Sequence, residues 1–230
     1  MRDAENIRQV EALGIDWMGF IFWPKSKRYV SQRPAYLPTR CKRVGVFVDA
    51  DIEQVRRTAE DYALDIIQLH GSESPEYLRQ LHVQRSTFNV QRSPFNVHRP
   101  PFNVQRSTSN VHRPIIKAFN IATKDDLEAT KPYEGIADYF LFDTKAQVPG
   151  GSGRQFDWSV LADYVGETPY LLSGGIGPDD AERLHAFFVG CGSAAAKCVG
   201  IDLNSRFELS PGLKDVTVLA RFLNELRIKH

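Results

Sequence analysis

The sequence predicts an α/β fold, the (β/α)₈ or TIM barrel, in which parallel strands alternate with helices. Short apolar runs alternate with amphipathic helical patterns along the body of the chain. Glycine-bearing loops follow three of the late runs, at residues 150–153, 173–175 and 199–205. With the repeat at residues 83–114 set aside, close to 200 residues remain, which suits a single barrel of the smallest usual size.

Each element of the expected barrel has a local signal. Apolar residues three or four apart predict helices, and short runs rich in β-branched or aromatic residues predict buried strands. Thr123 with Asp126 three residues later is a helix-capping pattern. In order, we expect a helix at 3–13, a strand at 17–22, a short helical piece, a strand at 43–48, a helix at 52–62, a strand at 66–70, a helix from Ser74-Pro75 to 81, a strand at 115–119, a helix after Thr123, a strand at 139–142, a helix at 158–164, a strand at 170–172, a helix at 178–188, a strand at 198–201 and a helix at 214–228.

This count gives seven strands, one fewer than a complete barrel has. Because the chain opens on a helix, we expect a TIM barrel that lacks its first strand in this chain. A single barrel domain then spans residues 1–230, with residues 83–114 as an insert within it.

The insert is a low-complexity heptapeptide repeat in which valine, arginine and asparagine recur every seven residues. Pro94, Pro100 and Pro101 exclude a coiled coil, and a solenoid needs units of roughly 20 residues or more. We expect a disordered loop between the fourth helix and the fifth strand of the barrel. The alternative is a nucleic-acid-binding segment, which its dilute charge and internal position disfavour.

The composition argues against several classes of protein. There is no run of about 18 apolar residues, so we expect no membrane span. The net charge of +1 is smaller than the contribution of the repeat's five arginines; the body is therefore mildly acidic, and we expect no nucleic acid partner. Three cysteines without metal-ligand spacing, and a polar start, predict a cytoplasmic protein without a metal site.

The glycine-bearing loops together predict a phosphate site. Phosphate binds backbone N–H groups that can approach it closely, and the loops after the last strands of a (β/α)₈ barrel commonly supply them. A single Gly-Gly pair after a strand is most often only a turn. Three such loops in series favour phosphate binding.

The motifs also resemble a known family. They are Gln68-Leu69-His70-Gly71, Phe142-Asp143-Thr144, Ser173-Gly174-Gly175, Arg2-Asp3 and the segments 19–22, 24–30, 45–48, 150–153 and 156–158. In this order and spacing they resemble the phosphoribosylanthranilate isomerases of tryptophan biosynthesis over essentially the whole body. The resemblance implies an aldose–ketose isomerase that needs no cofactor. Its Amadori rearrangement converts N-(5-phosphoribosyl)anthranilate to the carboxyphenylamino-deoxyribulose phosphate.

The resemblance also implies residue roles. Asp143 is the general acid that protonates the ribose ring oxygen, unless it only caps a turn. Arg28 binds the anthranilate carboxylate, unless it is merely solvated. His70 is catalytic or a satisfied strand-end histidine, and Asp202 organises its loop, since a carboxylate repels phosphate. The implied phosphate-binding residues are Gly151, Gly153, Ser173, Gly174, Gly175, Asn204 and Ser205.

One departure concerns the general base. In the family it is a cysteine in a Cys-Gly pair on the first strand, just ahead of the Arg-Asp pair that is Arg2-Asp3 here; this chain lacks it. The positions of Cys41, Cys191 and Cys198 do not suit the role. We expect that Met1 is not the natural start, and that roughly seven upstream residues ending in Cys-Gly supply a strand of ordinary length.

Three functions therefore stay open. The first is the isomerase, acting on a small phosphosugar–anthranilate substrate as a monomer or homodimer. The second is a catalytically impaired relic of that enzyme, because the base is missing from the chain as given. The third is another phosphate-binding barrel such as indole-glycerol-phosphate synthase, for which no catalytic lysine on an early strand or extra N-terminal segment is visible.

Overall fold

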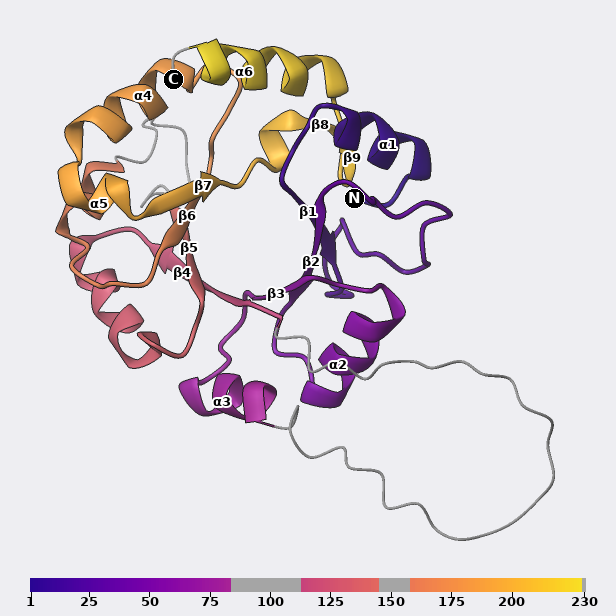
Figure 1. Ribbon diagram of the computed structural model, residues 1–230, viewed down its shortest axis with the longest axis horizontal. Helices are drawn as coiled ribbons and strands as arrows, with labels where there is room; N and C mark the ends of the chain where they lie inside the picture. Colours follow the sequence, from indigo (N-terminus) through magenta and orange to yellow (C-terminus); the bar gives the residue numbers. More distant parts are fainter. Residues whose placement is uncertain (84–112, 145–157, 229–230) are drawn as a thin grey trace, which may run out of the picture.

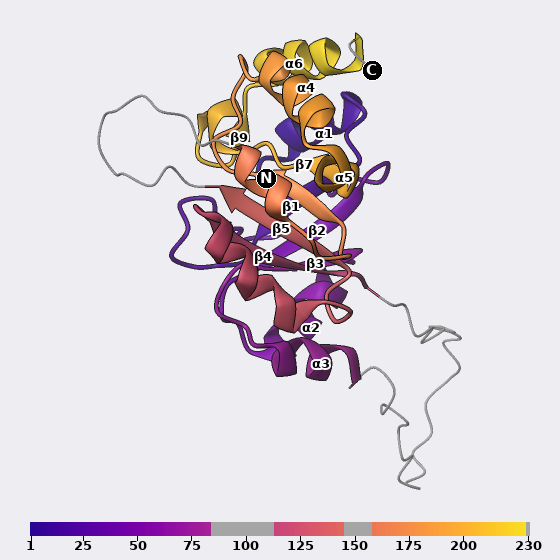
Figure 2. The ribbon, with the colours of Figure 1, turned by 90° about the vertical axis from the view of Figure 1, so that its left-hand side faces the viewer.

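The computed structural model describes residues 1–83, 113–144 and 158–228. Its main sheet consists of seven strands in chain order, each pairing in parallel with the next. They are β1 (Trp17–Ile21), β2 (Lys42–Phe47), β3 (Ile66–Leu69), β4 (Ile115–Ile121), β5 (Tyr139–Thr144), β6 (Tyr170–Ser173) and β7 (Cys198–Ile201). The strands curve around a common centre and run in one direction (Figures 1 and 2).

Within the described residues β1 and β7 end the sheet and do not pair with each other. The expected TIM barrel of seven strands, without its first, is therefore confirmed. Helices surround the sheet (Figure 1). They are α1 (Ala4–Ala12), α2 (Ile52–Asp61), α3 (Pro75–Val83), the 3₁₀ helices η1 (Lys124–Tyr133) and η2 (Trp158–Asp163), α4 (Ala181–Gly190), α5 (Gly192–Ala196), η3 (Ser205–Phe207) and α6 (Val216–Ile228).

Several details differ from the sequence expectations. The helix after Thr123 is a 3₁₀ helix and contains Pro132, which has no N–H to donate within a helix. The short helical piece expected before β2 is instead an irregular segment with bends at residues 31–41. An antiparallel hairpin, β8 (Glu208–Ser210) with β9 (Leu213–Lys214), was not expected. Among the described residues, no helix is long and apolar enough to span a membrane.

The strands are buried on both faces, as a barrel wrapped by helices requires. Phe140 and Phe142 of β5 are fully buried among the helix-facing side chains, whereas Leu141 between them belongs to the cluster inside the barrel. The Phe142 ring lies 5.1 Å from that of Tyr164 and 4.6 Å from that of Tyr170. Each such buried ring contributes about 1.5–3 kcal/mol to the stability of the fold. This packing holds β5 in place, and with it Asp143, the residue after Phe142.

The flanks of the repeat lie at the amino ends of the strands. Val83 ends α3, and Arg113 donates from Nε to the Leu64 carbonyl, 2.8 Å away, just before β3. Residues 84–112 lie outside the described residues, so the insert at 83–114 and its disorder stay predictions. The chemistry expected from the sequence lies at the other end of the sheet, where the strands finish.

Candidate active site

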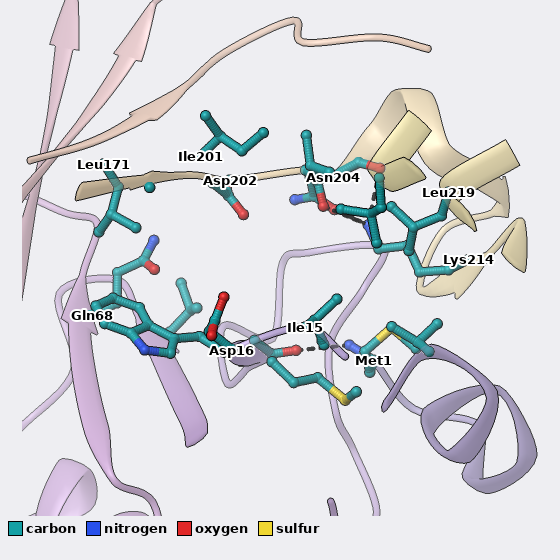
Figure 3. A pocket seen from close by; sticks show the side chains of 18 of the residues that line it. Met1, Ile15, Asp16, Gln68, Leu171, Ile201, Asp202, Asn204, Lys214 and Leu219 are labelled. Carbon is teal, nitrogen blue, oxygen red and sulfur yellow. Dashed lines mark hydrogen bonds between the residues drawn. The ribbon is translucent and has the colours of Figure 1, made fainter. Parts of the chain in front are cut away.

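A cavity of about 820 Å³ lies between the facing edges of β1 and β7. Apolar side chains from α4 and α6 line much of it, including Leu184 and Leu219. Polar groups from segments far apart in the sequence also line it, and Figure 3 labels Gln68, Asp202 and Lys214 among them. The set is Arg28, Gln68, His70, Asp202, Glu208 and Lys214. The apolar part of the cavity lies at the gap between β1 and β7, where a complete barrel has a further strand, so we consider only its polar side for a ligand.

Asp143 and His70 lie together at the carboxyl ends of β5 and β3. His70 Nε2 is 3.6 Å from Asp143 Oδ2, and the two side chains are partly exposed. The Gln68 side-chain nitrogen lies 3.1 Å from His70 Nδ1. With the Gln68 amide nitrogen as the donor, Nδ1 accepts, and a neutral ring in that tautomer has its proton on Nε2, facing Asp143. The sequence placed these residues at two strand ends, and the curved sheet brings them into contact.

Asp202 follows β7 and extends its carboxylate into the cavity (Figure 3). Ser173, the last residue of β6, donates to Asp202 Oδ2 at 3.0 Å. Burial raises the pKa of Asp202, and the nearby Lys214 charge opposes that shift. Asp202 thus connects the end of β6 to the loop after β7. It also offers the cavity a carboxyl group that keeps its proton to higher pH than usual.

Arg28 forms a two-pronged ion pair with Glu208, which sequence reasoning missed. Its Nε and Nη2 atoms donate to the Glu208 carboxylate at 2.6–3.0 Å, while Lys214 Nζ lies 3.5 Å away. Burial would raise the pKa of Glu208, but the Arg28 hydrogen bonds and the Lys214 charge hold it below its usual range. The two residues are 180 positions apart, and no local pattern marks Glu208 as the partner.

This pairing also orients the guanidinium group. Arg28 Nη1 makes no hydrogen bond to any residue in the described part of the chain, and Arg28 lines the cavity. A guanidinium has five N–H donors in a rigid plane. Glu208 therefore occupies one edge of the plane and leaves donors at Nη1 for a second carboxylate.

The structure describes two of the three expected groups of phosphate-binding residues. Ser173 is the last residue of β6, Gly174 and Gly175 follow it, and both glycines have positive φ angles, 89° and 69°. Nothing lies within 4 Å of a Cβ built on Gly175, so the backbone conformation, and not a lack of space, calls for glycine. Asn204 and Ser205 are exposed after β7, where Asn204 accepts from Lys214 Nζ. Gly151 and Gly153 lie outside the described residues.

The three cysteines lie away from these groups. Cys41 precedes β2, Cys191 follows α4, and Cys198 is the first residue of β7, at the amino end of that strand. Burial raises the pKa of both Cys41 and Cys198 to about 11. A thiol with so high a pKa supplies very little thiolate near neutral pH. Both the position and the chemistry of Cys41 and Cys198 thus exclude them as a base beside Asp143.

Comparisons with known proteins agree over nearly the whole chain. A family model described as N-(5'-phosphoribosyl)anthranilate (PRA) isomerase matches residues 1–96 and 90–225. The N-(5'-phosphoribosyl)anthranilate isomerase of Parabacteroides distasonis is 44% identical over 98% of this chain and 90% of its own length. That of Phocaeicola vulgatus is 42% identical over 100% of this chain and 96% of its own length.

A solved structure supports the same conclusion. The phosphoribosyl anthranilate isomerase of Thermotoga maritima superposes with a TM-score of 0.71 at 27% identity, covering 99% of this chain and 95% of that one. The match of sequence and fold is therefore continuous along the chain, and this protein belongs to the N-(5'-phosphoribosyl)anthranilate isomerase family.

Proposed function

We propose that this protein catalyses the Amadori rearrangement of N-(5'-phosphoribosyl)anthranilate in tryptophan biosynthesis. One observation carries the proposal beyond family membership: Asp143 lies beside His70 at the carboxyl ends of the strands, 3.6 Å from its Nε2 atom. Barrel enzymes carry their chemistry at this end of the sheet. The side chains proposed to bind the two ends of the substrate lie at the same end.

In the proposed reaction Asp143 transfers its proton to the ribose ring oxygen as the bond from that oxygen to the first ribose carbon breaks. The anthranilate nitrogen supplies the electron pair and becomes an iminium. Loss of a proton from the second carbon then gives an enolamine, which converts to the aminoketone. His70, with its Nε2 proton facing the carboxylate, stabilises the Asp143 anion that remains.

The base that takes the carbon-bound proton is assigned to no residue of this chain. The family resemblance gives that step to a cysteine ahead of Arg2-Asp3, and the described cysteines do not lie beside Asp143. A second candidate is a catalytically impaired relic that keeps the binding groups. The two candidates share the fold and the substrate and differ in turnover.

Substrate binding would use both ends of the molecule. Arg28 would bind the anthranilate carboxylate through the donors that Glu208 leaves available. The phosphate would lie against backbone N–H groups of Gly174 and Gly175 and near Asn204 and Ser205, with Gly151 and Gly153 completing the site. The cytoplasmic location, the absence of a cofactor, and the state as monomer or homodimer remain predictions from the sequence.

Genetic complementation tests the proposal. The gene is expressed in a tryptophan-requiring strain that lacks only this isomerase, with the Asp143→Asn variant as the matched control. Growth without tryptophan by the unaltered chain, and none by the variant, is the expected result. Equal growth of both would remove Asp143 from the mechanism. No growth with soluble protein present would favour the relic.

A further inference from the structure

A buried ion pair that the proposed mechanism does not use lies behind His70. Lys117 Nζ on β4 is 3.2 Å from Glu73 Oε2, and the two side chains are only 3% and 1% exposed. Removing two charges from water is costly unless further hydrogen bonds satisfy them. Replacement by packed apolar side chains is often as stable, so stability alone does not explain the pair.

The two side chains hold both peptide groups of Gly71, the residue after His70. Lys117 Nζ donates to the Gly71 carbonyl at 2.7 Å. The Gly71 N–H donates to the two Glu73 oxygens, 3.0 and 3.3 Å away. The same carboxylate accepts the Asp49 N–H at 2.9 Å. The ion pair thus joins the loop after β3 to the turn after β2.

The turn at Asp49 is in direct contact with the loop after β3. Asp49 has a positive φ of 48°, and its carboxylate accepts from the backbone N–H and hydroxyl of Ser72 at 2.6 and 2.8 Å. A Cβ added to Gly71 would lie 2.7 Å from the Asp49 backbone nitrogen. Because that neighbour is backbone, a side-chain rotation cannot relieve the clash, and the two loops form one rigid unit.

His70 is therefore fixed on both sides. Its own N–H donates to the Phe47 carbonyl at 2.8 Å, and the next residue is held by the ion pair. We propose that Glu73 and Lys117 are positioning residues that act through His70, holding its imidazole against Asp143. The inference rests on the proposed function, because it concerns the acid of that reaction. Neither residue touches the substrate cavity.

A double-mutant cycle tests the proposal by kinetics. Glu73→Ala should lower kcat about 10- to 100-fold with little change in KM, because small misplacements of catalytic groups have effects of this size. In a His70→Gln background the same substitution should have less than about a twofold effect, since residues acting as one unit are not additive. Glu73→Gln keeps an acceptor oxygen and should restore most of the activity.

Glu134→Ala provides the matched control at the opposite end of the barrel. Glu134, which precedes β5, also accepts several hydrogen bonds. They come from the Thr168 N–H and hydroxyl and from the Tyr164 hydroxyl, in the segment before β6. The Glu134→Ala substitution should lower stability equally with and without the His70→Gln substitution, and its effect on kcat should not depend on His70. Equal losses of kcat from Glu73→Ala with and without His70 would overturn the proposal.

A measurement without turnover separates this inference from the proposed function. Imidazole NMR signals are recorded for the unaltered chain, with His70→Gln for assignment. Glu73→Ala should move the His70 signal and leave that of His185, on α4, unchanged. If Glu73→Ala fails to fold, Glu73→Asp keeps the charge beside Lys117 and withdraws the carboxylate from the Gly71 N–H. An unmoved His70 signal in the folded variant refutes positioning, whether or not the chain isomerises its substrate.

Discussion

Two carboxylates at opposite ends of β5 allow an effect on catalysis to be distinguished from an effect on stability. Asp143 is the last residue but one of β5, at its carboxyl end, and Asp138 precedes the strand at its amino end. Asp143→Asn keeps the shape of the side chain and removes its acidity. If Asp143 is the general acid, kcat should fall about 10²- to 10⁴-fold, equivalent to about 3–5 kcal/mol of transition-state stabilisation.

The same substitution should barely affect folding. Asp143 and His70 are partly exposed and 3.6 Å apart, a geometry that contributes under about 1 kcal/mol. Asp138→Ala should behave in the opposite way, because Asp138 Oδ2 accepts the Ile115 N–H at 2.7 Å. Leaving that donor unsatisfied costs about 1–3 kcal/mol, with kcat unchanged.

Steady-state kinetics and thermal unfolding of the two variants check this. Each kcal/mol should shift Tm by roughly 2–4 °C in a chain of this size. KM should stay close to its original value in both variants, because the proposed carboxylate and phosphate contacts lie elsewhere. Near-full turnover by Asp143→Asn would refute the assignment of the acid. A loss of kcat in Asp138→Ala equal to that in Asp143→Asn would show that the assay reports folding.

Three further predictions concern binding, the insert and acid stability. Arg28→Lys keeps a positive charge beside Glu208 but loses the planar guanidinium group. KM should therefore rise at least about tenfold, with kcat nearly constant. An unchanged KM in a substrate titration would contradict the role of Arg28 in binding the substrate carboxylate. Deleting residues 83–111 should leave the fold and kcat intact, because each doubling of loop length costs only about 0.6 kcal/mol. The residues that flank the repeat also lie at the end of the sheet opposite the candidate active site. Loss of soluble protein would show that the repeat packs against the barrel. Hydrogen bonds from Tyr36, Arg40 and Thr39 outweigh burial and lower the pKa of Glu11, as Arg28 does for Glu208. Stability should therefore be fully present above the unfolded carboxyl pKa of about 4.3 and fall as the pH drops through the lower folded values. Calorimetry from pH 7 to 3 checks the direction, and Glu11→Gln should flatten the fall.

The sequence by itself determined the order of strands and helices, and it predicted the strand ends at which we place the chemistry. Strand signals such as Ile66–Leu69 are local, because the side chains that bury a strand on both faces lie within it. The prediction of a short helix before β2 was wrong because it used only local sequence. Residues 31–41 are held by Glu11 of α1, which accepts from the Tyr36 hydroxyl and the Thr39 N–H, and no local pattern records that contact.

Only the tertiary structure decided which polar groups meet. Arg28 and Glu208 are brought together by the closing curve of the barrel, and Glu73 and Lys117 by the pairing of neighbouring strands across the insert. Such contacts depend on distances between segments remote in the chain, which residue spacing does not encode. Asp143 was recognisable from its place at the end of a strand. The position of its neighbour His70 depends instead on the buried ion pair of Glu73 and Lys117, which holds the loop after β3.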